Sequence, residues 1–230
     1  TSVELAEASK EIMHSLVSNL DETGFDKTGY GDYLKSMTEA AVASLDSITL
    51  SGYDAQDLPE IARYLSAGAV AAVDDLDGVT TTDLGELIKD ITEGSTLGLD
   101  DITMEGYDPT DVADIMKQIS AGSVSALNDI VLTGYSSSDY NSLISEISEG
   151  ATVGLAAIDS AEFDFNPESI LSDVAEGASV GVKDLDNYTL TMDQLESLIN
   201  DGAELGAAEA VAEGGSITLN EGGMNLDTAI

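Results

Sequence analysis

One pattern of about twenty residues recurs along the chain, and it constrains the fold more than any other feature. Each copy has an acidic start, apolar residues at helical spacing, a central glycine and a run of small residues. Clear copies begin at Asp57, Asp83, Asp111 and Asp139. In the copy from Asp83 to Ile102 the apolar positions follow i, i+3, i+4, i+7 spacing, which places them on one face of an α-helix. The pattern therefore predicts a series of amphipathic helices.

The central glycine needs a role, because glycine inside a helix costs about 1 kcal/mol relative to alanine. It either caps a short helix or lets a neighbouring helix approach closely. We favour close packing, because the apolar face continues through the glycine without a change of phase. Several helices add a second glycine one turn later, at the spacing of closely packed helices. The predicted helix-packing residues are Gly68, Gly94, Gly98, Gly122, Gly150, Gly154, Gly177 and Gly181, with Gly202 and Gly206 in the last copy.

A longer period indicates how the helices pair. The sequence Ser-Ala-Gly at Gly68 recurs at Gly122, and Glu-Gly at Gly94 recurs at Gly150, so the separations are 54 and 56 residues. Helix types thus alternate, which suggests a duplicated pair of helices. We expect an all-α, elongated, solenoid-like array of about eight helices, in units of roughly 27 residues that form mainly antiparallel αα-hairpins.

Projecting the pattern outward gives the expected elements. The helices should occupy about 2–20 and 30–45, and then begin near Asp57, Asp83, Asp111, Asp139, Ser169 and Gln194. The repeat forms a single domain over residues 1–213, and residues 214–230 form a tail that either docks on another copy or caps the array. The recurring acids and the prolines Pro109 and Pro167 are typical of helix starts.

The connections between helices repeat as well. Several open with a few alternating apolar residues, which form either a very short strand or an apolar plug; we favour the plug. Each then carries an aromatic residue. These aromatics either form a ladder for a sugar or peptide, or plug the open end of a helix pair, and again we favour the plug. They are Phe25, Tyr53, Tyr107, Tyr135 and Phe165.

Charge and composition exclude several classes of function. The formal net charge is −38, with 45 acidic and 7 basic residues. Binding to nucleic acid or to an anionic membrane surface is therefore not expected, since few cations are present to meet phosphate. Cysteine is absent, which excludes disulfides and thiolate metal sites. Acids interrupt every apolar segment, so we expect no transmembrane helix.

No motif for catalysis is evident. The chain has one histidine, His14, and lacks nucleophile and phosphate-loop motifs. An EF-hand with Gly78 at its sixth position would need Val73 and Leu84 as ligands, so that motif fails. The densest acids, Asp74, Asp75 and Asp77, are weak candidates for calcium binding. We expect a protein that is not an enzyme and needs no cofactor.

Helical repeats mostly bind, space or assemble. We therefore expect an exported, acidic structural protein that forms a homo-oligomer or polymer, such as a surface filament, sheath or layer. The alternative function is a monomeric, adhesin-like binding module for a protein or glycan, and the alternative location is a halophile's cytoplasm. The assembly tail would contribute the apolar residues Ile217, Leu219, Met224, Leu226 and Ile230.

Overall fold

The computed structural model contains eight α-helices in the residues that it describes, together with short 3₁₀ turns. The described residues are 1–20, 27–48, 52–103, 106–107, 109–130, 136–158, 167–186 and 188–212. The helices are α1 (Ser2–Ser18), α2 (Tyr30–Ala43), α3 (Leu58–Ala71), α4 (Thr81–Leu97), α5 (Pro109–Ala126), α6 (Ser137–Ala157), α7 (Pro167–Lys183) and α8 (Met192–Ala212). The expected all-α array of eight helices is confirmed, and each helix begins within two residues of its expected start.

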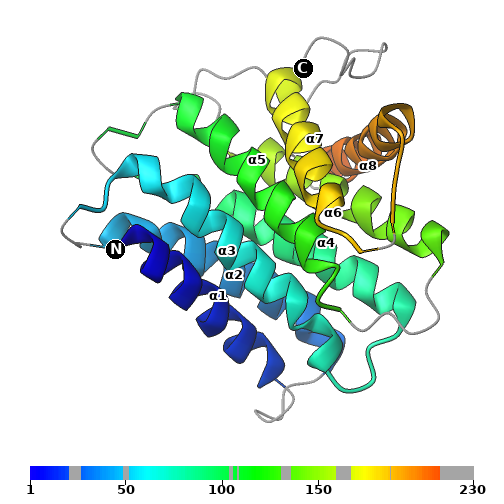
Figure 1. Cartoon of the computed structure of the whole chain (residues 1–230), viewed down its shortest axis with the longest axis horizontal. Helices are drawn as coiled ribbons and strands as arrows, with labels where there is room; N and C mark the ends of the chain where they lie inside the picture. The colour runs from blue at the N-terminus through cyan, green and yellow to red at the C-terminus, as the bar shows by residue number, and fades with distance from the viewer. Residues whose placement is uncertain are drawn as a thin grey trace.

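The helices form two layers. Figure 1 shows α1, α3, α5 and α7 side by side in the layer nearer the viewer, with α2, α4, α6 and α8 behind them. Successive helices run in opposite directions, as the short connections require. The most extensive contacts, however, join helices two apart in the sequence, such as α3 with α5 and α4 with α6. The main packing is therefore between parallel helices of one layer, and not within the αα-hairpins that the sequence suggested as the unit.

The glycines explain this preference for parallel neighbours. Gly94 of α4 faces the carbonyl of Lys35 in α2, and Gly98 one turn later faces the carbonyl of Glu39. The residue numbers rise together along both helices, from Gly94 to Gly98 and from Lys35 to Glu39, so the two helices run parallel. A Cβ on either glycine would overlap the facing backbone, because the gap is smaller than van der Waals contact. The predicted close packing is thus confirmed.

The same contact recurs along both layers. Each central glycine lies on the later helix of a parallel pair and faces a backbone carbonyl on the earlier one. The pairs are Gly68 with Lys10, Gly94 with Lys35, Gly122 with Arg63, Gly150 with Lys89, Gly177 with Lys117 and Gly202 with Ser145. Among the described glycines, those with positive φ are Gly52, Gly78 and Gly106, so none of these central glycines is a left-handed helix cap.

The first two helices lack this glycine, and their position in the array explains why. Ser15 and Ala40 stand where α1 and α2 would carry it, and both residues are exposed. Among the described helices, α1 and α2 are the earlier members of their parallel pairs, with α3 and α4. Without a close neighbour, glycine would only lower helix stability. We call the row of central glycines that face a parallel helix the glycine seam, and it begins at α3 and α4.

Helix starts use the recurring acids in a specific way. Thr80 precedes α4 and receives a hydrogen bond from the Asp83 backbone, while the Thr80 backbone N–H donates to the Asp83 carboxylate at 3.0 Å. Ser136 and Asp139 repeat this capping box at α6. The acid is thus the third helical residue and not the cap itself, which corrects the expected starts at Asp83 and Asp139.

The described connections behave as plugs. Ile102 is buried, and Tyr53 and Tyr107 pack against the core. The Tyr53 hydroxyl donates to the carbonyl of Leu45 at 3.1 Å, so it is not simply directed into water. No strand is present in the described part of the chain. Phe25, Tyr135 and Phe165 lie outside the described residues.

Candidate functional site

Basic residues follow the glycine seam, which sequence reasoning did not notice. Five of the seven basic residues lie five positions before the central glycine or its equivalent. They are Lys10, Lys35, Arg63, Lys89 and Lys117. The backbone carbonyl of each receives the glycine of the next parallel helix. Each side chain is then placed to reach an acid on a later helix or connection. The constant spacing of five was the available signal.

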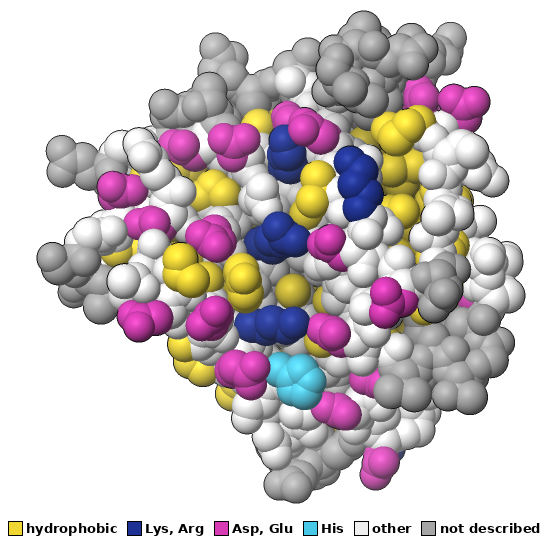
Figure 2. Space-filling model, in the orientation of Figure 1, with side chains coloured by type: hydrophobic (Ala, Val, Ile, Leu, Met, Phe, Trp, Pro, Cys, Tyr) yellow, Lys and Arg dark blue, Asp and Glu magenta, His cyan; other side chains and the backbone are white. Residues whose placement is uncertain are grey.

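In the odd-numbered layer these side chains form a row of ion pairs. Lys10 Nζ lies 3.0 Å from Asp129 Oδ2, and Arg63 pairs with Asp184 at 3.3 Å. Lys117 Nζ lies 2.5 Å from Glu176 of α7. Figure 2 shows the basic side chains in a row across this face with acids beside them. Each of these three cations therefore has an acidic partner on a later helix or connection.

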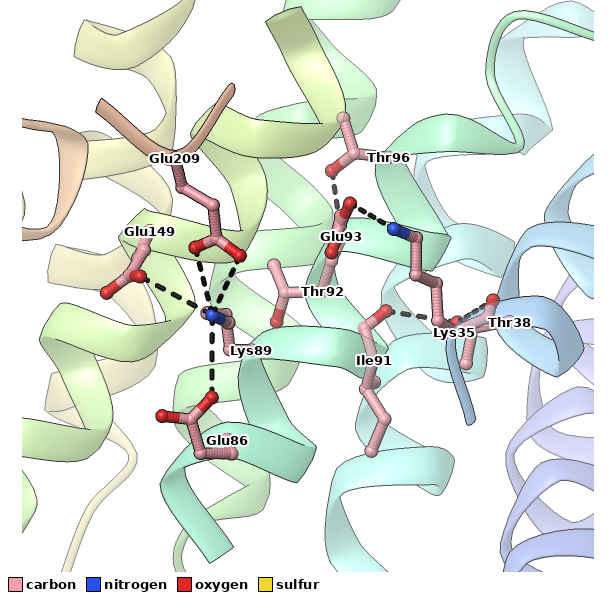
Figure 3. A network of polar contacts seen from close by, with 10 residues as sticks. All are labelled: Lys35, Thr38, Glu86, Lys89, Ile91, Thr92, Glu93, Thr96, Glu149 and Glu209. Carbon is pink, nitrogen blue, oxygen red and sulfur yellow. Dashed lines mark hydrogen bonds and ion pairs between the residues drawn. The ribbon is translucent and has the colours of Figure 1, made fainter. Parts of the chain in front are cut away.

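In the even-numbered layer the pairs are more buried. Lys35 of α2 pairs with Glu93 of α4, and the Glu93 side chain is only 6% exposed. Lys89 of α4 makes a larger set of ion pairs (Figure 3). Its Nζ lies 3.4 Å from Glu86, 3.5 Å from Glu149 of α6 and 3.0 Å from Glu209 of α8, and we call these four residues the Lys89 hub. One ammonium group thus connects three helices of one layer.

The hub shifts the ionisation of its members. Burial lowers the pKa of Lys89, but the carboxylates of Glu209, Glu86 and Glu149 outweigh that effect, and the net pKa is above its usual value. Burial, together with a hydrogen bond to Glu209, raises the pKa of Glu149 to about 7. Burial also acts to raise the pKa of Glu209, but hydrogen bonds from Lys89 and Glu149 hold it below its usual value. The two shifts are opposite in sign, so a proton bound by this pair favours Glu149 over Glu209.

A small open cavity of about 340 Å³ lies beside the starts of α2 and α4. Its lining includes the carboxylates of Asp32, Asp83, Glu86 and Asp90. The Asp90 carboxylate lies directly against the backbone of Gly31. Burial raises the pKa of Asp90 to about 6, and Glu93 and Glu86 add to the effect. The cavity has no nucleophile or metal cluster among its described residues, so we assign it no chemistry.

Exposed large apolar side chains are confined to the ends of the array. Within the described residues none lies on α3, α4, α5, α6 or α7. Ile12 and Leu16, one turn apart on α1, are 58% and 51% exposed. Leu205 and Val211 of α8 are 56% and 59% exposed. The other exposed large apolar residues are Val3 of α1, Tyr33 of α2 and Met192 of α8.

The predicted calcium ligands are not brought together. Asp74, Asp75 and Asp77 are exposed in the turn between α3 and α4. Asp75 lies 3.7 Å from His14. No group of three or more acidic or histidine side chains in the described residues is arranged to hold a metal ion. Weak calcium binding by the acidic surface remains a prediction. The tail residues Ile217, Leu219, Met224, Leu226 and Ile230 lie outside the described residues.

These features define an all-α, two-layer helical array with a glycine seam and a ladder of ion pairs in each layer. No known family matches the chain, and no curated protein is detectably similar to it. None of the described helices combines the length and apolar character that a bilayer crossing requires.

Proposed function

We propose that this protein is a non-enzymatic structural protein whose copies join end to end through the two edges of the helical array. The observation that carries the proposal is that, among the residues whose burial is described, exposed large apolar side chains lie only on α1, α2 and α8. Monomeric proteins scatter such residues singly, whereas clusters at one place mark contact surfaces. Here the two edges lie at opposite ends of the array, which suits a head-to-tail contact that does not close on itself.

The contact between two copies cannot have the same geometry as the glycine seam between parallel helices of one copy. Ser15 and Ala40 occupy the positions that carry glycine in later helices, and their side chains would meet the carbonyl of any helix seated in that register. The joint is therefore looser and relies on side chains such as Ile12, Leu16 and Leu205. Burying four half-exposed side chains contributes on the order of 3 to 6 kcal/mol. That is a weak contact against the entropy lost on association.

Charge sets the conditions for assembly. Two copies with a net charge of −38 repel each other at low salt. Screening by sodium or calcium reduces that repulsion within a Debye length. The lack of cysteine and the acid-rich composition favour an exported protein that meets such ions outside the cell. A halophile's cytoplasm is the alternative setting.

The test compares assembly of the wild type with a matched pair of variants. Light scattering and electron microscopy at rising concentration, with added salt or calcium, should show extended oligomers. Ile12→Glu/Leu16→Glu should remain monomeric, whereas Gln56→Glu/Ser138→Glu adds the same charge away from the edges and should still assemble. A wild type that stays monomeric under all these conditions would favour the alternative, a binding module for a protein or glycan.

A further inference from the structure

The environment of Lys89 is unusual in its balance of charge. One ammonium faces three carboxylates, from Glu86, Glu149 and Glu209. Glu86 is 62% exposed and solvated, but the side chains of Lys89 and Glu149 are only 10% and 13% exposed. The Glu209 side chain is intermediate, at 33% exposed. Apart from the solvated Glu86, the hub therefore contains one positive group and two carboxylates. It is neutral when the two carboxylates share one proton, and it carries an uncompensated, partly buried negative charge when they do not.

The position of Glu209 gives this balance a structural consequence. Glu209 lies in the last turn of α8, and its pair with Lys89 is an ion pair from that turn to α4. The first half of α8 is held by other contacts, because Gly202 packs on Ser145 and the Ser148 hydroxyl donates to the carbonyl of Ile199 at 2.8 Å. The glycine contact continues at Gly206, which faces the carbonyl of Glu149, so the hub matters most for the last turns that follow. Loss of the hub should thus affect the end of α8 and spare its first half.

We propose that Glu149 and Glu209, facing Lys89, form a proton-operated latch for the last turns of α8. With one proton shared between the carboxylates the latch is closed, as Glu149–H donates to Glu209 and Glu209 pairs with Lys89. When that proton leaves, the two carboxylates repel each other across α6 and α8, and the end of α8 loosens. The sharing of a proton is supported by the opposite pKa shifts of Glu149 and Glu209.

Other charged groups near the latch define the necessary controls. Glu86 and Glu93 lie on α4, Glu146 lies on α6, and Lys35 of α2 pairs with Glu93. Burial raises the pKa of Glu146, and nearby Glu86 adds to that shift. Burial also raises the pKa of Asp90 of α4, to about 6, but Asp90 lies against Gly31 of α2. Glu146 and Asp90 are therefore the groups to be separated from Glu149.

Hydrogen exchange measured by mass spectrometry tests the latch. Rates are corrected for their intrinsic pH dependence, and the full-length protein is studied at concentrations where it is monomeric, so the result does not depend on assembly. Amides of residues 206–212 in the wild type should be better protected at about pH 6 than at about pH 8.5, by about threefold or more, while residues 195–203 should not change.

Variants identify the group responsible. Glu149→Gln keeps a donor for Glu209 and should protect residues 206–212 equally at both pH values. Asp90→Asn and Glu146→Gln should retain the wild-type pH dependence. Equal protection of wild-type residues 206–212 at both pH values would overturn the latch, as would a Glu149→Gln protein that still shows the dependence. Far-ultraviolet circular dichroism checks that each variant is folded.

Discussion

Gly150 of α6 lies against the backbone carbonyl of Lys89 in α4, so closely that a Cβ on Gly150 would overlap the carbonyl oxygen. The same residue, Lys89, uses its side chain to reach Glu149, the neighbour of that glycine. Backbone approach and ion pair are therefore two parts of one contact. Because the contact repeats at other glycines, it sets the distance between parallel helices throughout each layer.

The first prediction concerns this approach. Gly150→Ala should destabilise the protein by about 1 to 3 kcal/mol, because the overpacked backbone contact cannot relax without moving a helix. In a helix with no close neighbour, the same change should stabilise the protein by about 1 kcal/mol. The sign of the change in unfolding free energy therefore distinguishes a closely packed glycine from one without a neighbour. The measurement is urea unfolding followed by circular dichroism. Ala40→Leu, at the equivalent but exposed position of α2, serves as the control and should be close to neutral.

A second prediction concerns buried hydroxyls. Ser66 of α3 and Ser123 of α5 share a buried hydrogen bond of 2.5 Å. The equivalent pair one step along is Ser120 and Ala178, and the buried Ser120 hydroxyl has no hydrogen-bond partner. Ser66→Ala should therefore cost about 1 to 3 kcal/mol, because it leaves Ser123 unpaired, whereas Ser120→Ala should be neutral or stabilising.

A substitution on α7 could give the unpaired Ser120 hydroxyl a hydrogen-bond partner. Ala178→Ser would place a hydroxyl where α7 meets Ser120, at the position that Ser123 holds in α5. Chemical unfolding of the single and double variants gives the coupling energy directly. A Ser120→Ala variant that loses as much stability as Ser66→Ala would show that Ser120 has a partner after all.

The third prediction concerns pH. Burial raises the pKa of Asp90 to about 6 in the folded protein, above its ordinary value of 3.8. The folded state thus holds a proton that the unfolded state has released. This contribution to stability is fully present below about pH 4 and is lost as the pH rises through about 6. Asp90→Asn should raise the melting temperature at pH 8 by a few degrees and have little effect at low pH.

The control for Asp90 removes the same charge elsewhere. Asp101→Asn, at an exposed position after α4, should shift the melting temperature slightly and without this pH dependence. If Asp90→Asn and Asp101→Asn behave alike at every pH, general charge repulsion and not the burial of Asp90 governs the profile.

A fourth prediction separates screening from a calcium site. Melting temperature should rise with added salt, because screening relieves repulsion among the 45 acidic residues. Sodium chloride at matched ionic strength should reproduce the effect of calcium. A stoichiometric calcium transition by calorimetry, abolished by Asp74→Asn/Asp75→Asn/Asp77→Asn, would instead establish a dedicated site in that turn.

Much of the architecture follows from the sequence because helix periodicity and glycine spacing are local signals. The eight helices and the close approach at Gly94 and Gly150 could both be predicted in this way. Which helices pack against each other could not be predicted from the sequence. Short connections suggest that consecutive helices pack together, but the glycine faces are satisfied only by a parallel helix two positions away, which is a tertiary relationship.

The charged ladder shows a different limit. The spacing from Lys89 to Gly94, five residues, is visible in the sequence and recurs from Arg63 to Gly68 and from Lys117 to Gly122. Its partners are not visible, because Glu149 and Glu209 lie 60 and 120 residues away. In so acidic a chain, nothing local distinguishes those carboxylates from others on the surface. The exposed edges likewise become evident only when burial along the whole array is known.

The central claim, that copies join head to tail through α1 and α8, is tested most directly by cross-linking. The chain has no cysteine, so introduced thiols are the only ones present. Ile12→Cys/Leu205→Cys should give a ladder of covalent oligomers with a short bis-thiol reagent, whereas a mixture of the two single variants should give dimers alone. Each single variant by itself should give no covalent dimer. Dimers from Ile12→Cys alone would show a symmetric contact, and no cross-linking of the double variant under assembly conditions would contradict the account.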